Sequence, residues 1–255
     1  MIYDADTWVG YWPYRRLPYT SVADLLRQMD SHGIEKALVA SLQGIFYTDS
    51  HEANRELYQQ VRRHRDRLVP CAILNPTYFG WERDLKQCRE EWSMPVLRLI
   101  PQYHGYKLTD SVAEEIVSAA HELKMRVALY GRVVDLRGRS PLDHSRQVPS
   151  DEIISLFKKF PGATFMLLNS TPLKPLRGKN APKIYQDTAL MHGGFGAGIE
   201  NGLKTCTVDR LMFGSTMLLR YCQPAIIAVG RLKLTKSQKD KILFKNLKRI
   251  VPEIG

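Results

Sequence analysis

Eight short runs of β-forming residues alternate with helical patterns along this chain of 255 residues. The runs are mostly continuously apolar, which is typical of strands buried on both faces of a parallel sheet. A helical pattern follows nearly every run, and eight such units predict that the sheet closes into a barrel. The expected strands cover residues 1–10, 36–41, 68–74, 96–100, 126–130, 164–168, 184–188 and 210–213.

We therefore predict an α/β protein in which residues 1–255 form a single domain, a (β/α)8 TIM barrel. The length is suitable, since such a barrel takes roughly 250 residues. No linker long enough to divide the chain is visible. Helices are expected over residues 22–32, 52–64, 81–92, 111–123, 150–160, 198–204, 223–232 and 236–251.

Charge and cysteine content narrow the classes of partner. The formal net charge of +11 favours anionic partners, whether small phosphorylated or carboxylated molecules, nucleic acid or an acidic surface. Basic clusters at residues 60–67 and 233–249 lack the interleaved aromatic residues of nucleic-acid modules, so solvated helix faces are favoured over nucleic-acid binding. The four cysteines are widely spaced and form no CxxC pair, which predicts free thiols.

The sequence also bears on the cellular compartment. No apolar run approaches the ~18 residues that a membrane span needs, and Met1 leads into the first strand without a signal sequence. These features predict a cytoplasmic protein without a membrane partner. Assembly into a homo-oligomer is left open.

The first strand ends in side chains that can carry chemistry, namely Asp4, Asp6, Thr7 and Trp8. In a (β/α)8 barrel the C-terminal ends of all strands converge on one mouth, where active sites lie. Residues far apart in sequence should therefore share a pocket there. The side chains expected at this mouth are Asp6, Trp8, Arg98, Tyr130, Arg132, Asn169, Asp187, His192 and Thr216.

Three stretches, residues 2–10, 95–99 and 209–216, resemble the amidohydrolase-related branch of the metal-dependent hydrolase superfamily. The most specific part runs from Phe213-Gly214-Ser215 through Arg220-Tyr221 to the helix at residues 241–250. The resemblance implies a (β/α)8 barrel. It also implies hydrolysis of C–N or C–O bonds, or decarboxylation or hydration of small carboxylic acids, usually with one divalent metal.

The metal ligands that the resemblance implies are largely replaced. The His-x-His of the first strand corresponds to Asp6 and Trp8, two further histidines to Tyr130 and Asn169, and the final aspartate to Thr216. Only Asp6 is a good ligand, whereas a zinc site needs about three protein ligands. We predict that the metal centre is absent and that no cofactor is used. A magnesium or calcium ion on Asp6, Asn169 and water is the alternative, with few carboxylates to support it.

In place of a metal we expect acid/base chemistry on a small anionic organic substrate. Asp6 is the candidate general base and Tyr130 the candidate proton donor, with His104 and Asn169 as further catalytic candidates. The competing interpretation is that Arg98 or a hydroxyl holds Asp6, which then only keeps the mouth in shape.

Arginines suggest where the substrate binds. Four lie in the loop at residues 132–146 and suit bidentate recognition of carboxylate or phosphate, although ion pairs with Asp135 and Asp143 are an alternative. The substrate-binding candidates are Trp8, Arg98, Arg132, Arg137, His192, Thr216 and Arg220.

Three function classes remain. The first is a metal-independent hydrolase, lyase or cyclase. The second is a metal-dependent hydrolase or decarboxylase with an altered ligand set, and the third is a non-catalytic protein that binds a small molecule. Fold alone does not separate them, because function resides in the site.

Overall fold

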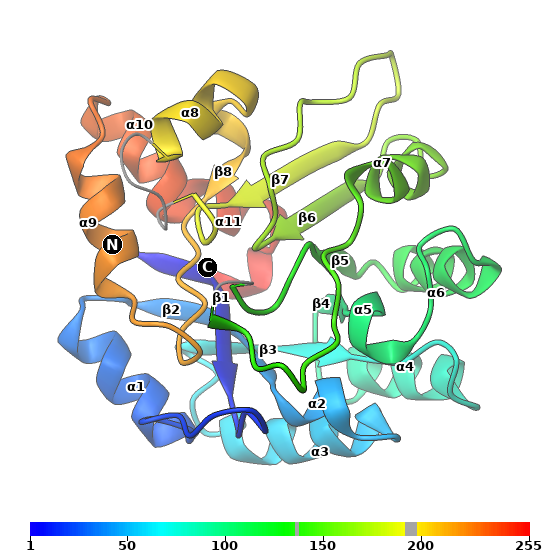
Figure 1. Ribbon diagram of the computed structural model, residues 1–255. Helices are drawn as coiled ribbons and strands as arrows, with labels where there is room; N and C mark the ends of the chain where they lie inside the picture. The colour runs from blue at the N-terminus through cyan, green and yellow to red at the C-terminus, as the bar shows by residue number, and fades with distance from the viewer. Residues whose placement is uncertain (136–137, 192–197) are drawn as a thin grey trace.

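The computed structural model describes residues 1–135, 138–191 and 198–255. Eight parallel strands form one sheet in sequence order, with helices around the outside (Figure 1). Hydrogen bonds from Ala5 N to Phe213 O (3.0 Å) and from Trp8 N to Met217 O (2.5 Å) bring the first and last strands together. The predicted (β/α)8 barrel is confirmed. The strands are β1 (Tyr3–Val9), β2 (Lys36–Ser41), β3 (Leu68–Ile73), β4 (Val96–Leu99), β5 (Arg126–Tyr130), β6 (Thr164–Leu168), β7 (Lys183–Asp187) and β8 (Leu211–Met212).

Seven of the helices that cover the barrel lie in the parts of the sequence where helical periodicity predicted them. They are α1 (Val22–Ser31), α3 (Ser50–Val61), α4 (Trp81–Glu90), α6 (Ser111–Glu122), α7 (Ser150–Lys158), α8 (Gly198–Thr205) and α9 (Gln223–Arg231). The first of them begins at a capping box, in which Asp24 N donates to Ser21 Oγ (3.1 Å) and Ser21 N donates to Asp24 Oδ2 (2.9 Å).

Two helices of four residues were not expected: α2 (Gln43–Phe46) after β2 and α5 (Pro101–His104) after β4. Both lie in loops that follow strand ends, so they help to form the rim of the barrel mouth. They are too short to show helical periodicity in the sequence.

Side chains that alternate along the strands fill the barrel interior. One cluster of buried residues contains Leu38 and Ala40 from β2, Ala128 and Tyr130 from β5, and Met166 and Leu168 from β6. The intervening residues pack outward against the helices in two other clusters. This alternation is the expected pattern of a closed barrel.

Strand β1 departs from simple alternation. Its pairing with β2 shifts register between Asp4 and Thr7. Tyr3 lies before the shift, Ala5 within it and Trp8 after it, and all three belong to the interior cluster. A bulge of this kind re-aims side chains, and here it lets both Ala5 and Asp6 take part in contacts inside the barrel.

The end of the barrel away from the mouth is filled by the last part of the chain. A continuous helical run comprises α10 (Lys236–Asp240), the π-helical η3 (Lys241–Lys245) and α11 (Asn246–Ile250). It is followed by the short η4 (Pro252–Ile254), while another short helix, η2 (Val208–Arg210), precedes β8. Leu247, Ile250, Val251 and Ile254 join the interior cluster. Figure 1 accordingly shows the C-terminus amid the strands.

Two further expectations concern the chain as a whole. All four cysteines are free and buried, as their spacing predicted. Within the described residues, every helix is too short or too polar to cross a lipid bilayer.

Candidate site at the mouth of the barrel

Asp6 lies at the centre of a buried polar network. Its Oδ1 accepts a hydrogen bond from the Tyr130 hydroxyl of β5 and lies 3.5 Å from Nη1 of Arg98 on β4. Its Oδ2 accepts from Thr216 Oγ1 at 2.9 Å. Asp6, Arg98, Tyr130 and Thr216 are all 0% exposed. Both carboxylate oxygens of Asp6 are therefore occupied by protein donors.

Two aromatic rings pack against this network. The Arg98 guanidinium lies over the Trp8 ring, 4.9 Å from its centroid, and the Trp8 and Tyr130 rings are 5.2 Å apart. Burial and the nearby Asp6 raise the pKa of the Tyr130 phenol well above its ordinary value. Tyr130 therefore remains a hydrogen-bond donor throughout the physiological pH range.

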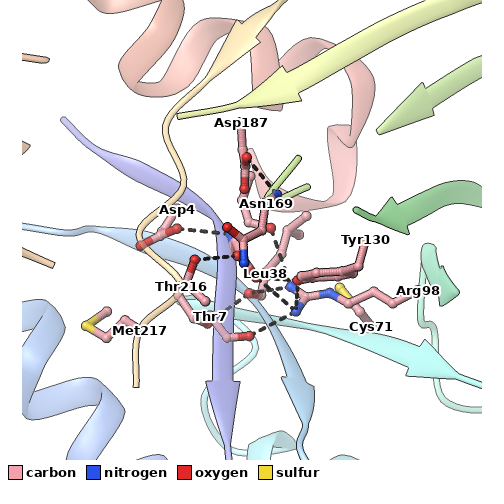
Figure 2. A network of polar contacts seen from close by, with 12 residues as sticks. Asp4, Thr7, Leu38, Cys71, Arg98, Tyr130, Asn169, Asp187, Thr216 and Met217 are labelled. Carbon is pink, nitrogen blue, oxygen red and sulfur yellow. Dashed lines mark hydrogen bonds and ion pairs between the residues drawn. The ribbon is translucent and has the colours of Figure 1, made fainter. Parts of the chain in front are cut away.

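Two other buried carboxylates flank Asp6. Asp4 accepts hydrogen bonds from Asp6 N (3.0 Å), Ser215 N (3.1 Å) and Ser215 Oγ (2.5 Å). Burial nevertheless raises the pKa of Asp4 to about 7. Asp187 accepts from Asn169 N (2.9 Å), and burial together with Asp6 raises the pKa of Asp187 well above its ordinary range. Figure 2 shows Asp187 and Asn169 on one side of the network and Asp4 beside Thr216.

Strained backbone accompanies the network at two of its positions. Asn169 has φ 43° and Thr216 has φ 59°, both in the left-handed region. Asparagine adopts this region fairly readily, but for a β-branched threonine it is a true outlier. The Asn169 amide is fixed by hydrogen bonds from Nδ2 to the carbonyls of Arg132 (2.7 Å) and Val133 (3.1 Å).

A pocket of about 770 Å3 opens beside the network. We call it the mouth pocket. It is formed by the loop after β1, the loop after β5 and the segment after β8. Its charged and aromatic lining residues are Trp12, Tyr14, Arg15, Arg16, Tyr19, Asp135, Arg139, Asp143, Arg220 and Tyr221.

The polar network and the mouth pocket are separate in this structure. None of the four network residues lines the pocket, whereas Met217, the neighbour of Thr216, does. Met217 pairs with Thr7 of β1, so this segment forms a wall between the two. Arg220 links them electrostatically: it lines the pocket, and its pKa, lowered by burial, is raised in part by Asp6, Asp135 and Asp187.

The structure brings together only some of the residues that the sequence singled out. Asp6, Trp8, Arg98, Tyr130 and Thr216 are linked by a connected set of contacts, and Asn169 lies beside Asp187. Arg132 contributes its carbonyl to the Asn169 amide, and Arg220 lines the mouth pocket. Arg137 and His192 lie outside the described residues.

His104 lies apart from Asp6. Its Nε2 is 3.1 Å from the Gly44 carbonyl of α2, and the side chain is buried. Burial lowers the pKa of His104 to about 4, so its imidazole is neutral near pH 7. Among the described residues, no hydrogen bond joins it to the Asp6 network. Here the histidine connects two rim helices, α5 and α2.

The residues present do not fit the divalent metal that the resemblance implies. Asp6 has both oxygens engaged, Trp8 is no ligand, and a permanently charged guanidinium lies 3.5 Å from Asp6 Oδ1. In the described part of the chain, no group of three or more His, Cys, Asp or Glu side chains could hold a metal ion. A metal would have to displace Tyr130 and Arg98 to bind Asp6 Oδ1, or Thr216 to bind Oδ2.

Sequence reasoning noted Asp4 at the end of the first strand but missed two features of the site, its pairing with Ser215 and the arginines of the loop after β1. Asp4 and Ser215 bond each other across the junction of β1 and β8, which a bulge in β1 and a two-residue β8 made hard to foresee. Arg15 and Arg16 enter the mouth pocket from the loop after β1. The available signal was their position, since this basic and aromatic loop directly follows a strand end.

Fold and site together define a (β/α)8 barrel with its polar side chains gathered at the strand ends, the place where such barrels carry binding and catalytic residues. No family model matches the chain, and no curated protein matches its sequence.

Solved structures do resemble it. One is 5-carboxyvanillate decarboxylase from Sphingomonas paucimobilis, with TM-score 0.76, 13% identity and 98% of each chain covered. Another is dihydroxybenzoic acid decarboxylase from Polaromonas sp. JS666 with bound manganese and the inhibitor 2-nitroresorcinol, with TM-score 0.73 and 14% identity over 98% of this chain and 96% of that one. A third is a probable 2-pyrone-4,6-dicarboxylic acid hydrolase from Acinetobacter baumannii with citric acid bound, with TM-score 0.66 and 14% identity over 98% of this chain and 99% of that one. At this level of identity the similarities establish a shared fold.

Proposed function

We propose that this protein binds a small carboxylated or otherwise anionic organic molecule in the mouth pocket, without a resident metal. The observation that supports this is the charge of the lining: among the described residues it contains four arginines, Arg15, Arg16, Arg139 and Arg220, and two aspartates. Guanidinium groups suit carboxylates because they offer parallel donors and a fixed charge. Trp12, Tyr14, Tyr19 and Tyr221 add aromatic surface for the apolar part of the ligand.

Arg220 is the arginine best placed to hold the ligand anion. It is half-buried, and its Nη1 donates to the Ala189 carbonyl at 3.2 Å. Its Nη2 is buried and has no hydrogen-bond partner among the described residues. Arg15 and Arg139 also each donate to a backbone carbonyl, and Arg220 differs from them in its buried, unpartnered Nη2. A ligand carboxylate would complete the hydrogen bonding of Arg220.

The sequence resemblance and the shared fold support placing the chain as a divergent relative of the amidohydrolase-related enzymes. The three similar proteins are named for 5-carboxyvanillate, dihydroxybenzoic acid and 2-pyrone-4,6-dicarboxylic acid, all of which carry carboxyl groups. We extend this chemical class of ligand, and not a particular reaction, to the present chain.

Acid/base catalysis is the second candidate function. The hydrogen bond from Tyr130 to Asp6 and the raised pKa values of Asp4 and Asp187 favour it, because perturbed carboxyl groups gather at active sites. Asp6 is, however, sealed from the mouth pocket in this structure. Catalysis at Asp6 therefore requires the segment around Met217 to move when ligand binds.

Binding can be tested by calorimetry with pairs of ligands that differ in charge. Benzoate, dihydroxybenzoates and citrate should bind, whereas the matching neutral amides should bind at least roughly 10-fold more weakly, because a hydrogen bond to a charged group is worth about 1.5–3 kcal/mol. The change Arg220→Met should weaken carboxylate binding by a similar factor. Arg63→Met is the matched control, since Arg63 is exposed and does not line the pocket.

Two outcomes would contradict the binding proposal: equal affinity for an acid and its amide, or equal effects of the Arg220 and Arg63 changes. Mass spectrometry of the bound acids after incubation tests catalysis separately. Turnover that Asp6→Asn abolishes while binding persists would establish the second candidate, and unchanged turnover in Asp6→Asn would eliminate it.

A further inference from the structure

The guanidinium of Arg98 is surrounded by oxygen atoms at the centre of the barrel mouth. Nη1 donates to Tyr130 Oη (2.9 Å) and Thr7 O (3.1 Å) and lies 3.5 Å from Asp6 Oδ1. Nη2 donates to Leu38 O (3.1 Å) and Ala5 O (3.4 Å). One carboxylate, one phenol and three backbone carbonyls thus face a single cation. Figure 2 shows Arg98 reaching from β4 toward Thr7 and Leu38.

This cation is closed off from solvent. Arg98 is 0% exposed, the Trp8 ring covers it at 4.9 Å from the centroid, and the Tyr130 ring lies at 5.7 Å. Arginine stays charged even when buried, since its guanidinium is not deprotonated in proteins. A positive charge that does not depend on pH therefore neighbours Asp6 in the structure.

The Arg98 guanidinium lies at the place where the family resemblance implies a metal. Asp6, Tyr130 and Thr216 stand at three of the positions where the resemblance implies metal ligands, and all three belong to this one network. A divalent ion on Asp6 would lie next to the guanidinium, where repulsion in a low-dielectric interior is strong. The same geometry gives Asp6 the positive neighbour that a metal would otherwise supply.

We propose that Arg98 is a built-in replacement for the divalent metal: its guanidinium neutralises Asp6, holds β1, β2 and β5 together, and prevents a metal from binding. Arg98 is in this view a positioning residue. The proposal concerns the buried network and does not depend on what the mouth pocket binds.

Chemical rescue tests the proposal. Arg98→Ala leaves Asp6 without its cation inside a cavity shaped for guanidinium, and its thermal midpoint should fall by about 10 °C or more. Millimolar guanidinium chloride, far below the molar range that unfolds proteins, should raise the midpoint of this variant and not that of the wild type. Urea has nearly the same shape without the charge, and sodium chloride matches the ionic strength, so neither should rescue. Equal effects of guanidinium and urea on Arg98→Ala would overturn the proposal.

A paired substitution covers the case in which Arg98→Ala does not fold. Arg98→Met leaves Asp6 as an uncompensated buried charge, and adding Asp6→Asn removes that charge, so the double variant should be the more stable one. A double variant no more stable than Arg98→Met alone overturns the proposal.

Metal analysis of wild-type protein from cells grown with manganese and zinc gives an independent result. Less than stoichiometric metal is expected, and one tightly bound divalent ion per chain would overturn the proposal.

Discussion

The hydroxyl of Thr216 donates to Oδ2 of Asp6 at 2.9 Å from a backbone held at φ 59°. This conformation costs a residue with a Cβ roughly 1–2 kcal/mol, and it persists only where the surrounding structure fixes it. Here the next residue supplies the restraint, because Met217 N donates to Ser215 Oγ (3.1 Å) and Met217 O accepts from Trp8 N (2.5 Å). The wall between Asp6 and the mouth pocket is thus held from both sides.

Removing this hydroxyl should destabilise the protein. Thr216→Val keeps the side-chain shape but leaves Oδ2 of a buried carboxylate without its donor, so the free energy of unfolding should fall by about 1–3 kcal/mol. Thr216→Ser keeps the donor and should lose less. Urea denaturation measures both variants, and Thr109→Val at an exposed position is the control. Equal losses in the valine and serine variants would show that the hydroxyl does not matter.

Two of the buried tyrosines, Tyr130 and Tyr106, should respond differently to loss of the hydroxyl. Tyr130 Oη donates to Asp6 and accepts from Arg98, so Tyr130→Phe should lower the free energy of unfolding by about 1–3 kcal/mol. The Tyr106 hydroxyl is buried without a partner among the described residues, so Tyr106→Phe should leave stability unchanged or raise it. Chemical denaturation of the two variants side by side checks this contrast, which a common loss would refute.

Asp4 should make stability decline as pH rises. Its carboxyl keeps its proton up to about pH 7 in the folded protein, against an ordinary pKa of 3.8. Between these values the folded state binds more protons than the unfolded chain, so the free energy of unfolding falls with increasing pH. Asp4→Asn should remove this contribution. The measurement is the difference between wild type and variant at pH 4.5 and about pH 7.5, with the exposed Asp151→Asn as control; a constant difference would count against the raised pKa.

His104, in contrast, should make the free energy of unfolding decline as the pH falls. Burial lowers its pKa from 6.5 to about 4, so the folded state binds fewer protons than the unfolded chain between these values. Its contribution to stability is present above pH 6.5 and is lost as the pH falls toward 4. His104→Asn should therefore flatten the acid side of the stability profile, whereas exposed His144→Asn should not. An unchanged acid slope in His104→Asn would contradict this assignment.

Much of the barrel could be predicted from sequence because its strands are buried on both faces. Strands β2, β5 and β6 occupy the predicted residues, since runs such as Arg126–Tyr130, apolar after the first residue, have clear limits. Strand β8 is shorter than predicted, at two residues, because the chain turns into the segment that contacts β1. The bulge in β1 left no mark in the residue pattern.

Sequence analysis predicted which residues belong to the site better than it predicted how they are bonded to one another. Convergence of strand ends predicted that Asp6, Tyr130 and Thr216 would meet. It could not show that their hydrogen bonds would be satisfied internally, because that depends on side-chain direction and on the backbone carbonyls around Arg98. The competing expectation that Arg98 or a hydroxyl holds Asp6 describes the observed contacts. The catalytic and substrate-binding roles of these residues remain predictions.

The packing of Leu247, Ile250, Val251 and Ile254 into the barrel interior has a consequence for the order of folding. These residues follow all eight strands in the sequence, yet they fill the interior that the strands enclose. During synthesis on the ribosome, the strands emerge before the segment that completes their core. A nascent chain ending before α11 should therefore expose apolar strand residues and be sensitive to proteases, and resistance should appear only once this last segment has emerged.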